Sequence, residues 1–157
     1  MKTNVFKKLD GKTLKVAIVQ SRFNEMITDG LKESAVKALL EIGVVEKNIK
    51  VLQVPGAFEI PLICKKIALA KKFNGIIALG AIIKGDTAHF EYVAGGATDG
   101  IMQVMLETNM PIAFGVLTTQ DKKQAEIRSG NDDSNKGREA ALALIETIGI
   151  IKNIGKK

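Results

Sequence analysis

The chain has 157 residues, of which 46% are hydrophobic and 25% are charged, and its formal net charge is +6. This composition predicts one globular domain spanning residues 1–157, because a chain of this length buries roughly 68–70% of its unfolded surface. The basic charge suits an anionic small-molecule ligand. The lysines are scattered and few aromatic residues lie among them, which argues against nucleic-acid binding. The sequence has no long apolar run, so we expect neither a membrane span nor a signal peptide, and we expect a location in the cytoplasm.

Apolar runs and helical periodicity alternate along the chain. In order, they predict an extended arm at 1–15, a strand at 16–19, a helix at about 28–42, a strand at 49–54, a helix at about 58–72, a strand at 76–79, a helix at about 89–109, a strand at 111–117, a short helix at 121–129 and a last helix marked by Ala141, Ile145 and Ile148. Gly43 is expected to end the first helix, and Pro61 fits the first turn of the second. Cys64, the only cysteine, falls in the second helix, where we expect a small buried hydrophobe rather than a nucleophile.

The strand segments are continuous apolar runs. Such strands, alternating with helices, are typical of a parallel sheet that is covered on both faces. We therefore expect an α/β fold, a three-layer α/β/α sandwich with a flavodoxin-like, four-stranded parallel sheet and helices on both faces. Sheets of this kind bind ligands beyond the carboxyl ends of their strands, so the loops that follow the strands are the candidate site.

Aromatic and polar residues collect in the loops that follow the first three strands. They are Phe23 after the first strand, Phe58 and Glu59 after the second, and Asp86, Thr87 and His89 after the third. An aromatic residue in a loop is more often a local plug than a stacking partner, but two of them beside a glycine-rich turn favour a flat ring as ligand. Phe114 lies within the fourth strand, and by itself it is expected in the core.

The stretch 80–93 combines two glycines, several polar residues and the only histidine of the chain. Gly80 and Gly85 are expected to let the backbone turn and approach a ligand closely. Backbone N–H groups at the start of the following helix suit an anion, because they are unpaired and carry the positive end of the helix dipole. Histidine can carry protons near neutral pH, which makes His89 the candidate proton carrier. The alternative interpretation is an ordinary loop with a surface histidine.

Three segments in these loops match a known family: Arg22-Phe23-Asn24, residues 54–61 (VPGAFEIP) and residues 85–93 (GDTAHFEYV). Further matches follow in the expected order at 114–118, Gln124-Ala125, Arg128 and 135–137. On these residues, which extend over nearly the whole chain, the sequence resembles the lumazine synthases. This family makes 6,7-dimethyl-8-ribityllumazine in the penultimate step of riboflavin biosynthesis.

The resemblance implies a transferase that acts on two small molecules without a cofactor or a metal. It would condense 5-amino-6-(D-ribitylamino)uracil with 3,4-dihydroxy-2-butanone 4-phosphate and release phosphate and water. The resemblance also implies a homo-oligomer, either a pentamer or a hollow sixty-subunit shell of twelve pentamers, and it allows riboflavin synthase as a protein partner.

The resemblance assigns one group of residues to the pyrimidine substrate. The matched positions are Phe23, Ala57, Phe58, Glu59, Ala81, Ile82 and Ile83. Phe23 would stack on the pyrimidine ring, and Glu59 would accept hydrogen bonds from the ribityl hydroxyls. The backbone of residues 81–83 would read the uracil edge.

A second group is assigned to the phosphate substrate and the chemistry. Asp86, Thr87 and Arg128 match the phosphate-site positions, and Lys136 matches a basic position nearby. A carboxylate would repel phosphate, so the backbone of Asp86 is the better candidate. His89 matches the general acid/base, and Phe114 would close the pocket from a neighbouring subunit.

The sequence departs from the usual family pattern within residues 128–137. Many family members have a threonine–lysine pair and another glycine where Asn131, Asp132 and Ser134 stand. Two acids, Asp132 and Asp133, thus fall in a segment associated with subunit assembly. The resemblance therefore leaves pentamer and shell as alternatives.

Other features bear on assembly and on competing functions. Val5, Phe6 and Leu9 have no place in a four-stranded domain, so we expect the arm to pair with a neighbour's sheet and each active site to be shared between subunits.

Two other functions compete with the enzyme. The protein could bind a flavin- or pterin-like ring without turnover, or it could be a structural shell subunit. The presence of both His89 and Arg128 favours the enzyme, because a pure ring binder needs no phosphate site.

Overall fold

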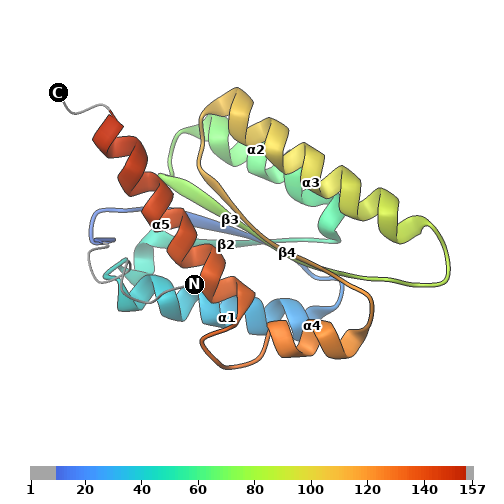
Figure 1. Cartoon of the computed structure of the whole chain (residues 1–157). Helices are drawn as coiled ribbons and strands as arrows, with labels where there is room; N and C mark the ends of the chain where they lie inside the picture. Colours follow the sequence, from blue (N-terminus) through green and yellow to red (C-terminus); the bar gives the residue numbers. More distant parts are fainter. Residues whose placement is uncertain (1–9, 155–157) are drawn as a thin grey trace.

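The computed structural model describes residues 10–154 (Figure 1). Its centre is a sheet of four parallel strands in the order β2-β1-β3-β4, so that β2 and β4 are the edge strands. The strands are β1 (Val16–Ser21), β2 (Ile49–Val54), β3 (Gly75–Ile83) and β4 (Ile112–Thr119). Val5, Phe6 and Leu9 lie outside the described residues, and the pairing expected of their arm stays a prediction.

Helices cover both faces of the sheet. They are α1 (Glu25–Glu41), α2 (Ile60–Ala70), α3 (His89–Thr108), α4 (Lys122–Arg128) and α5 (Lys136–Ile154), with the short 3₁₀ helices η2 (Glu46–Asn48) and η3 (Ala57–Glu59). The helices α2 and α3 lie over one face, whereas α1 and α5 lie over the other (Figure 1). The predicted three-layer α/β/α sandwich with a flavodoxin-like parallel sheet is confirmed. None of the described helices combines the length and the apolar character that a membrane crossing requires.

The core has two halves, one on each side of the sheet. Successive residues of β3 alternate between them: Ile77 and Leu79 pack toward α1 and α5, whereas Ile76 and Ala78 pack toward α2 and α3. This alternation is the two-residue period of a strand. Because helices cover both faces, both sets of side chains are apolar, which explains why β3 is a continuous apolar run in the sequence.

Strand β3 is longer than predicted, and the difference changes the role of Gly80. The sequence predicted a strand that ends at Leu79 and a turn at Gly80, but the pairing with β4 continues to Ile83 opposite Thr119. At Gly80 a Cβ would come within 3.3 Å of the Val116 side chain. The expectation that Gly80 turns the backbone is therefore wrong, because the position lies inside the sheet and serves close packing between neighbouring strands.

The helices differ from the predictions mainly at their ends. Helix α1 begins at Glu25, directly after Asn24, whose backbone is left-handed with φ 60°. Gly43 follows the end of α1 as predicted, with φ 92°. The helix expected from residue 58 is divided into η3 and α2, and Pro61 stands in the first turn of α2 as predicted. Local capping geometry, which apolar periodicity does not report, decides these boundaries.

Cys64 is a buried residue of α2, as predicted. Its side chain has no accessible surface and lies in the core between α2 and the sheet. Burial raises the pKa of the Cys64 thiol to about 12. The thiol therefore stays protonated near neutral pH and does not provide the thiolate that nucleophilic catalysis needs.

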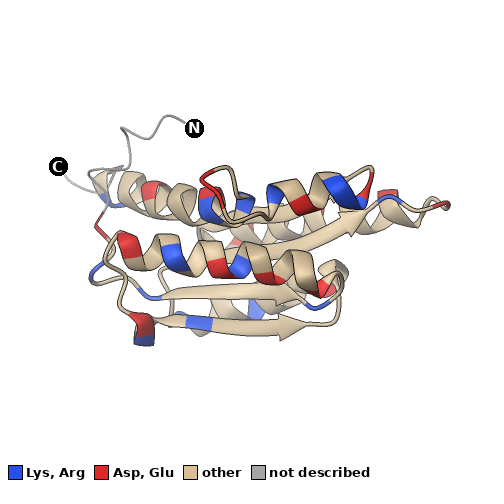
Figure 2. Cartoon of the chain, turned by 90° about the horizontal axis from the view of Figure 1, so that it is seen from below, with Lys and Arg blue, Asp and Glu red and all other residues tan. Residues whose placement is uncertain are grey.

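The charges are spread over the surface. In the view of Figure 2, basic and acidic residues are interspersed along the helices. Several basic side chains are paired with acids, among them Lys32 with Asp29 at 2.7 Å and Lys65 with Glu107 at 3.0 Å. This distribution agrees with the scattered lysines of the sequence.

Candidate active site

A cleft lies beyond the carboxyl ends of β1, β2 and β3. Its volume is about 780 Å³. The predicted site residues that line it are Phe23, Ala57, Phe58, Glu59, Ala81, Ile82, Ile83, Thr87 and His89. We call this space the aromatic cleft. It occupies the position at which parallel α/β sheets bind ligands.

The loop that carries Phe23 is anchored to both neighbouring strands. The Arg22 N–H donates to the Val54 carbonyl at 2.8 Å, and the Phe23 N–H donates to the Pro55 carbonyl at 3.1 Å. The Asn24 side-chain amide donates to the Ala81 carbonyl at 2.8 Å. The backbone is thus tied to the ends of β2 and β3, while the Phe23 ring remains 70% exposed. A held backbone with a free ring face is suited to stacking on a planar ligand.

Asn24 was part of the matched sequence motif but not of the predicted site. Its contribution depends on its left-handed backbone and on a contact with Ala81, which is far away in the sequence. Asparagine adopts positive φ more readily than most residues because its short polar side chain makes local hydrogen bonds. An asparagine in the short loop between a predicted strand and a predicted helix is therefore the signal that could have identified it.

The segment after β2 presents Phe58 and Glu59 to the aromatic cleft. One oxygen of the Glu59 carboxylate accepts a hydrogen bond from the Gly56 N–H at 2.9 Å, which closes the η3 turn. The Phe58 ring lies against Gly96 of α3, where a Cβ would come within 2.6 Å of the ring. Gly96 weakens the helix in isolation but leaves room for the ring. The two chain segments are thereby fitted to each other.

His89 is the first residue of α3 and lines the aromatic cleft. It is exposed, and its imidazole makes no hydrogen bond to the described residues, so the ring is available to a ligand. Its backbone N–H donates weakly to the Thr87 hydroxyl at 3.4 Å.

The turn before α3 has unpaired backbone donors. Within residues 10–154, the backbone N–H groups of 85–88 donate to no protein acceptor, and they precede the positive end of the α3 dipole. Asp86 is exposed in this turn, and its side chain does not line the cleft.

Phe114, Arg128 and Lys136 line a different cavity. This cavity has a volume of about 530 Å³ and runs along β4, with α4 and α5 on its sides. We call it the basic groove. Among residues 10–154, none lines both the basic groove and the aromatic cleft. Within one chain, the structure therefore does not bring these three residues to His89.

Phe114 is 44% exposed, so the interpretation of this residue by itself as core is wrong. The reason is the sheet order: β4 is an edge strand with a neighbour on one side only. Near it, Arg128 Nη1 donates to the Gln124 carbonyl at 3.0 Å, and Lys136 Nζ lies 2.7 Å from a carboxylate oxygen of Glu139. These contacts hold two cations at the wall of the groove.

Comparison with known proteins identifies the family. The family model described as 6,7-dimethyl-8-ribityllumazine synthase matches residues 13–152. The protein of that name from Lawsonia intracellularis is 48% identical over 145 residues, which cover 92% of each chain. The one from Desulfovibrio desulfuricans is 47% identical over 146 residues, which cover 93% of this chain and 94% of the relative. With a family match over nearly its whole length and a cleft at the strand ends that gathers the matching motifs, the chain belongs to the 6,7-dimethyl-8-ribityllumazine synthase family.

Proposed function

We propose that this chain is a transferase of riboflavin biosynthesis that forms 6,7-dimethyl-8-ribityllumazine. It condenses 5-amino-6-(D-ribitylamino)uracil with 3,4-dihydroxy-2-butanone 4-phosphate. The observation that carries the proposal is the aromatic cleft of a chain of this family, which combines the rings of Phe23 and Phe58, a carboxylate and the only histidine of the chain. We also propose that residues 1–157 form one domain that works in the cytoplasm.

The pyrimidine substrate is proposed to occupy the part of the cleft between Phe23 and β3. Phe23 stacks on the ring, and the backbone of residues 81–83 reads the uracil edge. Ala57 and Phe58 flank the ribityl chain, and Glu59 accepts hydrogen bonds from its hydroxyls. The anchored Phe23 loop supports this assignment, because a platform that is already in place loses little entropy when the ligand binds.

The phosphate substrate is proposed to bind at the start of α3. The backbone N–H groups of 85–87 make no hydrogen bond to the described residues, and the helix dipole favours an anion there. Asp86 contributes its backbone, since its carboxylate would repel phosphate, and Thr87 contributes its hydroxyl. Arg128 adds a guanidinium whose two parallel N–H donors match a phosphate.

His89 is proposed to move protons during the condensation. The amine attacks the ketone and loses water to form an imine, and phosphate is then eliminated from the four-carbon unit. The ribitylamino nitrogen attacks the carbonyl that remains, and a second water leaves as the ring closes. Acid–base assistance of such steps raises the reaction rate by about 10²–10⁴-fold. Holding two substrates together lowers the activation free energy by up to about 7–11 kcal/mol. Positioning by the cleft is therefore expected to supply most of the rate, and His89 the remainder.

Each active site is proposed to be shared between two adjacent subunits. The separation of the basic groove from the aromatic cleft supports this, because Phe114, Arg128 and Lys136 can act at a cleft only from a neighbouring chain. A ring with head-to-tail interfaces places the groove of one subunit against the cleft of the next. A homopentamer, its closure into a larger shell and an association with riboflavin synthase are further parts of the proposal, which family membership supports.

The activity is tested by incubating the purified protein with both substrates and following lumazine fluorescence and phosphate release. Formation of both products in equal amounts is expected. A protein that only holds a flavin- or pterin-like ring would bind the pyrimidine and release no phosphate, and a purely structural shell subunit would do neither.

Replacing Phe23 with alanine is expected to raise the KM for the pyrimidine substrate and to leave the KM for the phosphate substrate nearly unchanged. Stacking contributes on the order of 0.5–1.5 kcal/mol to the binding free energy, in addition to the contribution from burying apolar surface. Phe23→Tyr and Phe23→Trp are the matched controls, and they should keep most of the affinity because they keep an aromatic face. Equal pyrimidine affinity in the alanine variant would remove Phe23 from the site.

Mixing two poorly active variants is expected to restore activity if the site is shared. His89→Ala impairs the cleft and Arg128→Ala impairs the groove, and each protein alone should be poorly active. Unfolding and refolding them together in equal amounts gives rings in which about a quarter of the interfaces pair a native cleft with a native groove. The activity should therefore exceed the sum of the two parents. Native mass spectrometry verifies mixing, and mixed rings without recovered activity would show that the site lies within one chain.

A further inference from the structure

Arg128 and Lys136, the two cations of the basic groove, stand at the two ends of one loop. Arg128 is the last residue of α4, Lys136 is the first residue of α5, and residues 129–135 connect them. Asn135 is the fully buried polar residue of this loop, with 0% of its surface accessible. It is therefore the place at which the loop is held to the rest of the fold.

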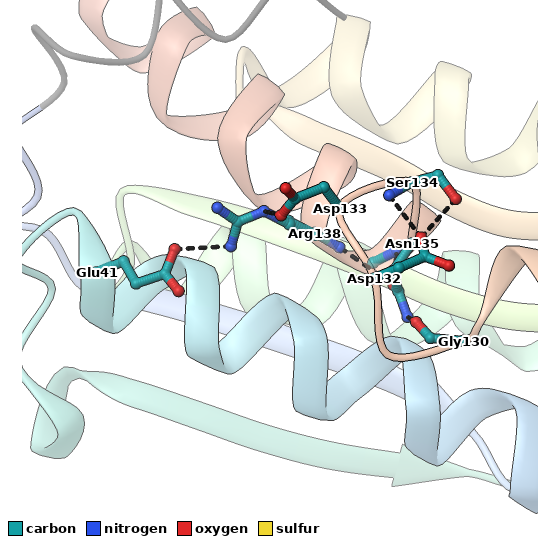
Figure 3. Close-up of polar contacts among 8 residues, drawn as sticks. Glu41, Gly130, Asp132, Asp133, Ser134, Asn135 and Arg138 are labelled. Atoms are coloured by element: carbon teal, nitrogen blue, oxygen red, sulfur yellow. Dashed lines mark hydrogen bonds and ion pairs between the residues drawn. The ribbon is translucent and has the colours of Figure 1, made fainter.

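The Asn135 side-chain amide joins three parts of the protein, and Figure 3 shows its contact with Gly130. Its Nδ2 donates to the carbonyl of Gly130, at the beginning of the loop, at 2.8 Å and to the carbonyl of Gly30, in α1, at 3.2 Å. Its Oδ1 accepts from the backbone N–H groups of Gly137 at 2.8 Å and of Arg138 at 3.3 Å, in the first turn of α5. An amide has two donors and two acceptor positions, and all four are used inside the protein.

Around this amide, backbone packs directly on backbone. A Cβ on Gly30 would lie 2.5 Å from the Ser129 carbonyl oxygen, and a Cβ on Gly137 would lie 1.9 Å from the Leu31 carbonyl oxygen. The two glycines thus leave no side chain to space α1 from the loop and from α5. The Asn135 amide makes hydrogen bonds to all three segments at the place where they meet.

The other polar contacts of the loop lie at the surface (Figure 3). Arg138 pairs with Glu41 at 2.7 Å and with Asp133 at 3.4 Å, and Asp132 accepts a hydrogen bond from the Ser134 N–H at 2.7 Å. The hydrogen bonds from Ser134 lower the pKa of the Asp132 carboxyl. Exposed pairs of this kind contribute little to stability because water competes for both partners. They are therefore poor candidates for holding the two cations of the groove.

We propose that Asn135 is a positioning residue for phosphate binding, which sets the distance and orientation between Arg128 and Lys136. This inference rests on the proposed function, in which Arg128 binds the phosphate substrate. Charge-assisted contacts to phosphate depend on the direction of the donors. A misplacement of about 1 Å in a binding group can cost on the order of 10²-fold in rate. A loop held by one buried amide supplies that accuracy, whereas a loop held by surface pairs would not.

The variant Asn135→Ser separates positioning from helix capping. Serine is a good N-cap residue, so it keeps an acceptor for the first turn of α5, but it lacks the amide donors that reach Gly30 and Gly130. We expect the KM for the phosphate substrate to rise about tenfold, which corresponds to about 1.4 kcal/mol, while the KM for the pyrimidine substrate stays near the wild-type value. Asn131→Ser is the matched control, because Asn131 lies in the same loop, is exposed and makes no hydrogen bond to the described residues. It should behave as wild type.

The variant Asn135→Asp provides a second test, with a side chain of nearly the same shape as asparagine. Its carboxylate keeps the acceptor for α5 but places a negative oxygen against the carbonyls of Gly30 and Gly130. The rise in the phosphate-substrate KM should exceed that of the serine variant. Urea unfolding of each variant gives the folded fraction, by which kcat is corrected. A purely structural role would lower only the uncorrected kcat, in proportion to the loss of folded protein, with no selective change in either KM.

Arg128→Ala and the double variant Arg128→Ala/Asn135→Ser distinguish this inference from the proposed function. If Asn135 acts through Arg128, the double variant should have the phosphate-substrate KM of Arg128→Ala alone, because the two effects are not additive. If Arg128→Ala leaves this KM unchanged, the proposed phosphate assignment is wrong. If Arg128→Ala raises it and both folded Asn135 variants do not, or if the effects simply add, the positioning role of Asn135 is overturned.

Discussion

Replacing His89 with alanine is expected to lower kcat by about 10²–10⁴-fold, the usual contribution of one acid–base group. His89 begins α3, lines the aromatic cleft and is the only histidine in the chain. Its imidazole has no partner among the described residues, so it is free to exchange protons with bound substrates. Both KM values should change little, because Phe23 and the start of α3 remain in place.

The activity of the His89→Ala protein should not vanish, because an amine condenses with a ketone without a catalyst and the cleft still positions both substrates. His89→Gln is the matched control: it keeps a polar side chain of similar length but cannot transfer protons, and it should resemble the alanine variant. The pH dependence of kcat should flatten in both. A His89→Ala protein with wild-type kcat and pH profile would contradict the assigned role.

Replacing Gly137 with alanine is expected to destabilise the fold by about 3 kcal/mol or more, the upper part of the range for overpacked sites. A Cβ at this position would lie 1.9 Å from the Leu31 carbonyl oxygen. The contact is with backbone, which cannot rotate away as a side chain would. Helices α1 and α5 would have to separate, and the hydrogen bonds of Asn135 would lengthen. Urea unfolding followed by circular dichroism measures the change.

Gly149→Ala, in the same helix, is the matched control and should have the opposite sign. In the part of the chain that the structure describes, no atom outside the local helix lies within 4 Å of a Cβ built at Gly149. The substitution should stabilise the protein by about 0.5–1 kcal/mol, because alanine favours the helix and restricts the unfolded chain. If both variants lost equal stability, the cause would be the loss of glycine in α5 in general, and the close contact with α1 would not be the reason.

Much of the fold could be predicted from the sequence because it depends on local patterns. Strand β2 was predicted at its observed bounds, and the continuous apolar runs correctly indicated a parallel sheet covered on both faces. The residues of the aromatic cleft could also be predicted, since the carboxyl ends of parallel strands meet at one edge of the sheet. Phe23, Phe58 and His89 follow three different strands, and the structure brings them together there.

The sequence by itself thus determined the layers, the parallel sheet and the edge at which the cleft lies, because these follow from hydrophobic period and from the geometry common to all parallel α/β sheets. Tertiary structure alone decided the rest. Gly80 was predicted in a turn because glycine permits one, but pairing with β4 keeps it in the strand. The exposure of Phe114 depends on β4 being an edge strand, which only the strand order reveals. Asn135 acts through a hydrogen bond to Gly30, 105 positions away, and such contacts between distant segments leave no periodic signal in the chain.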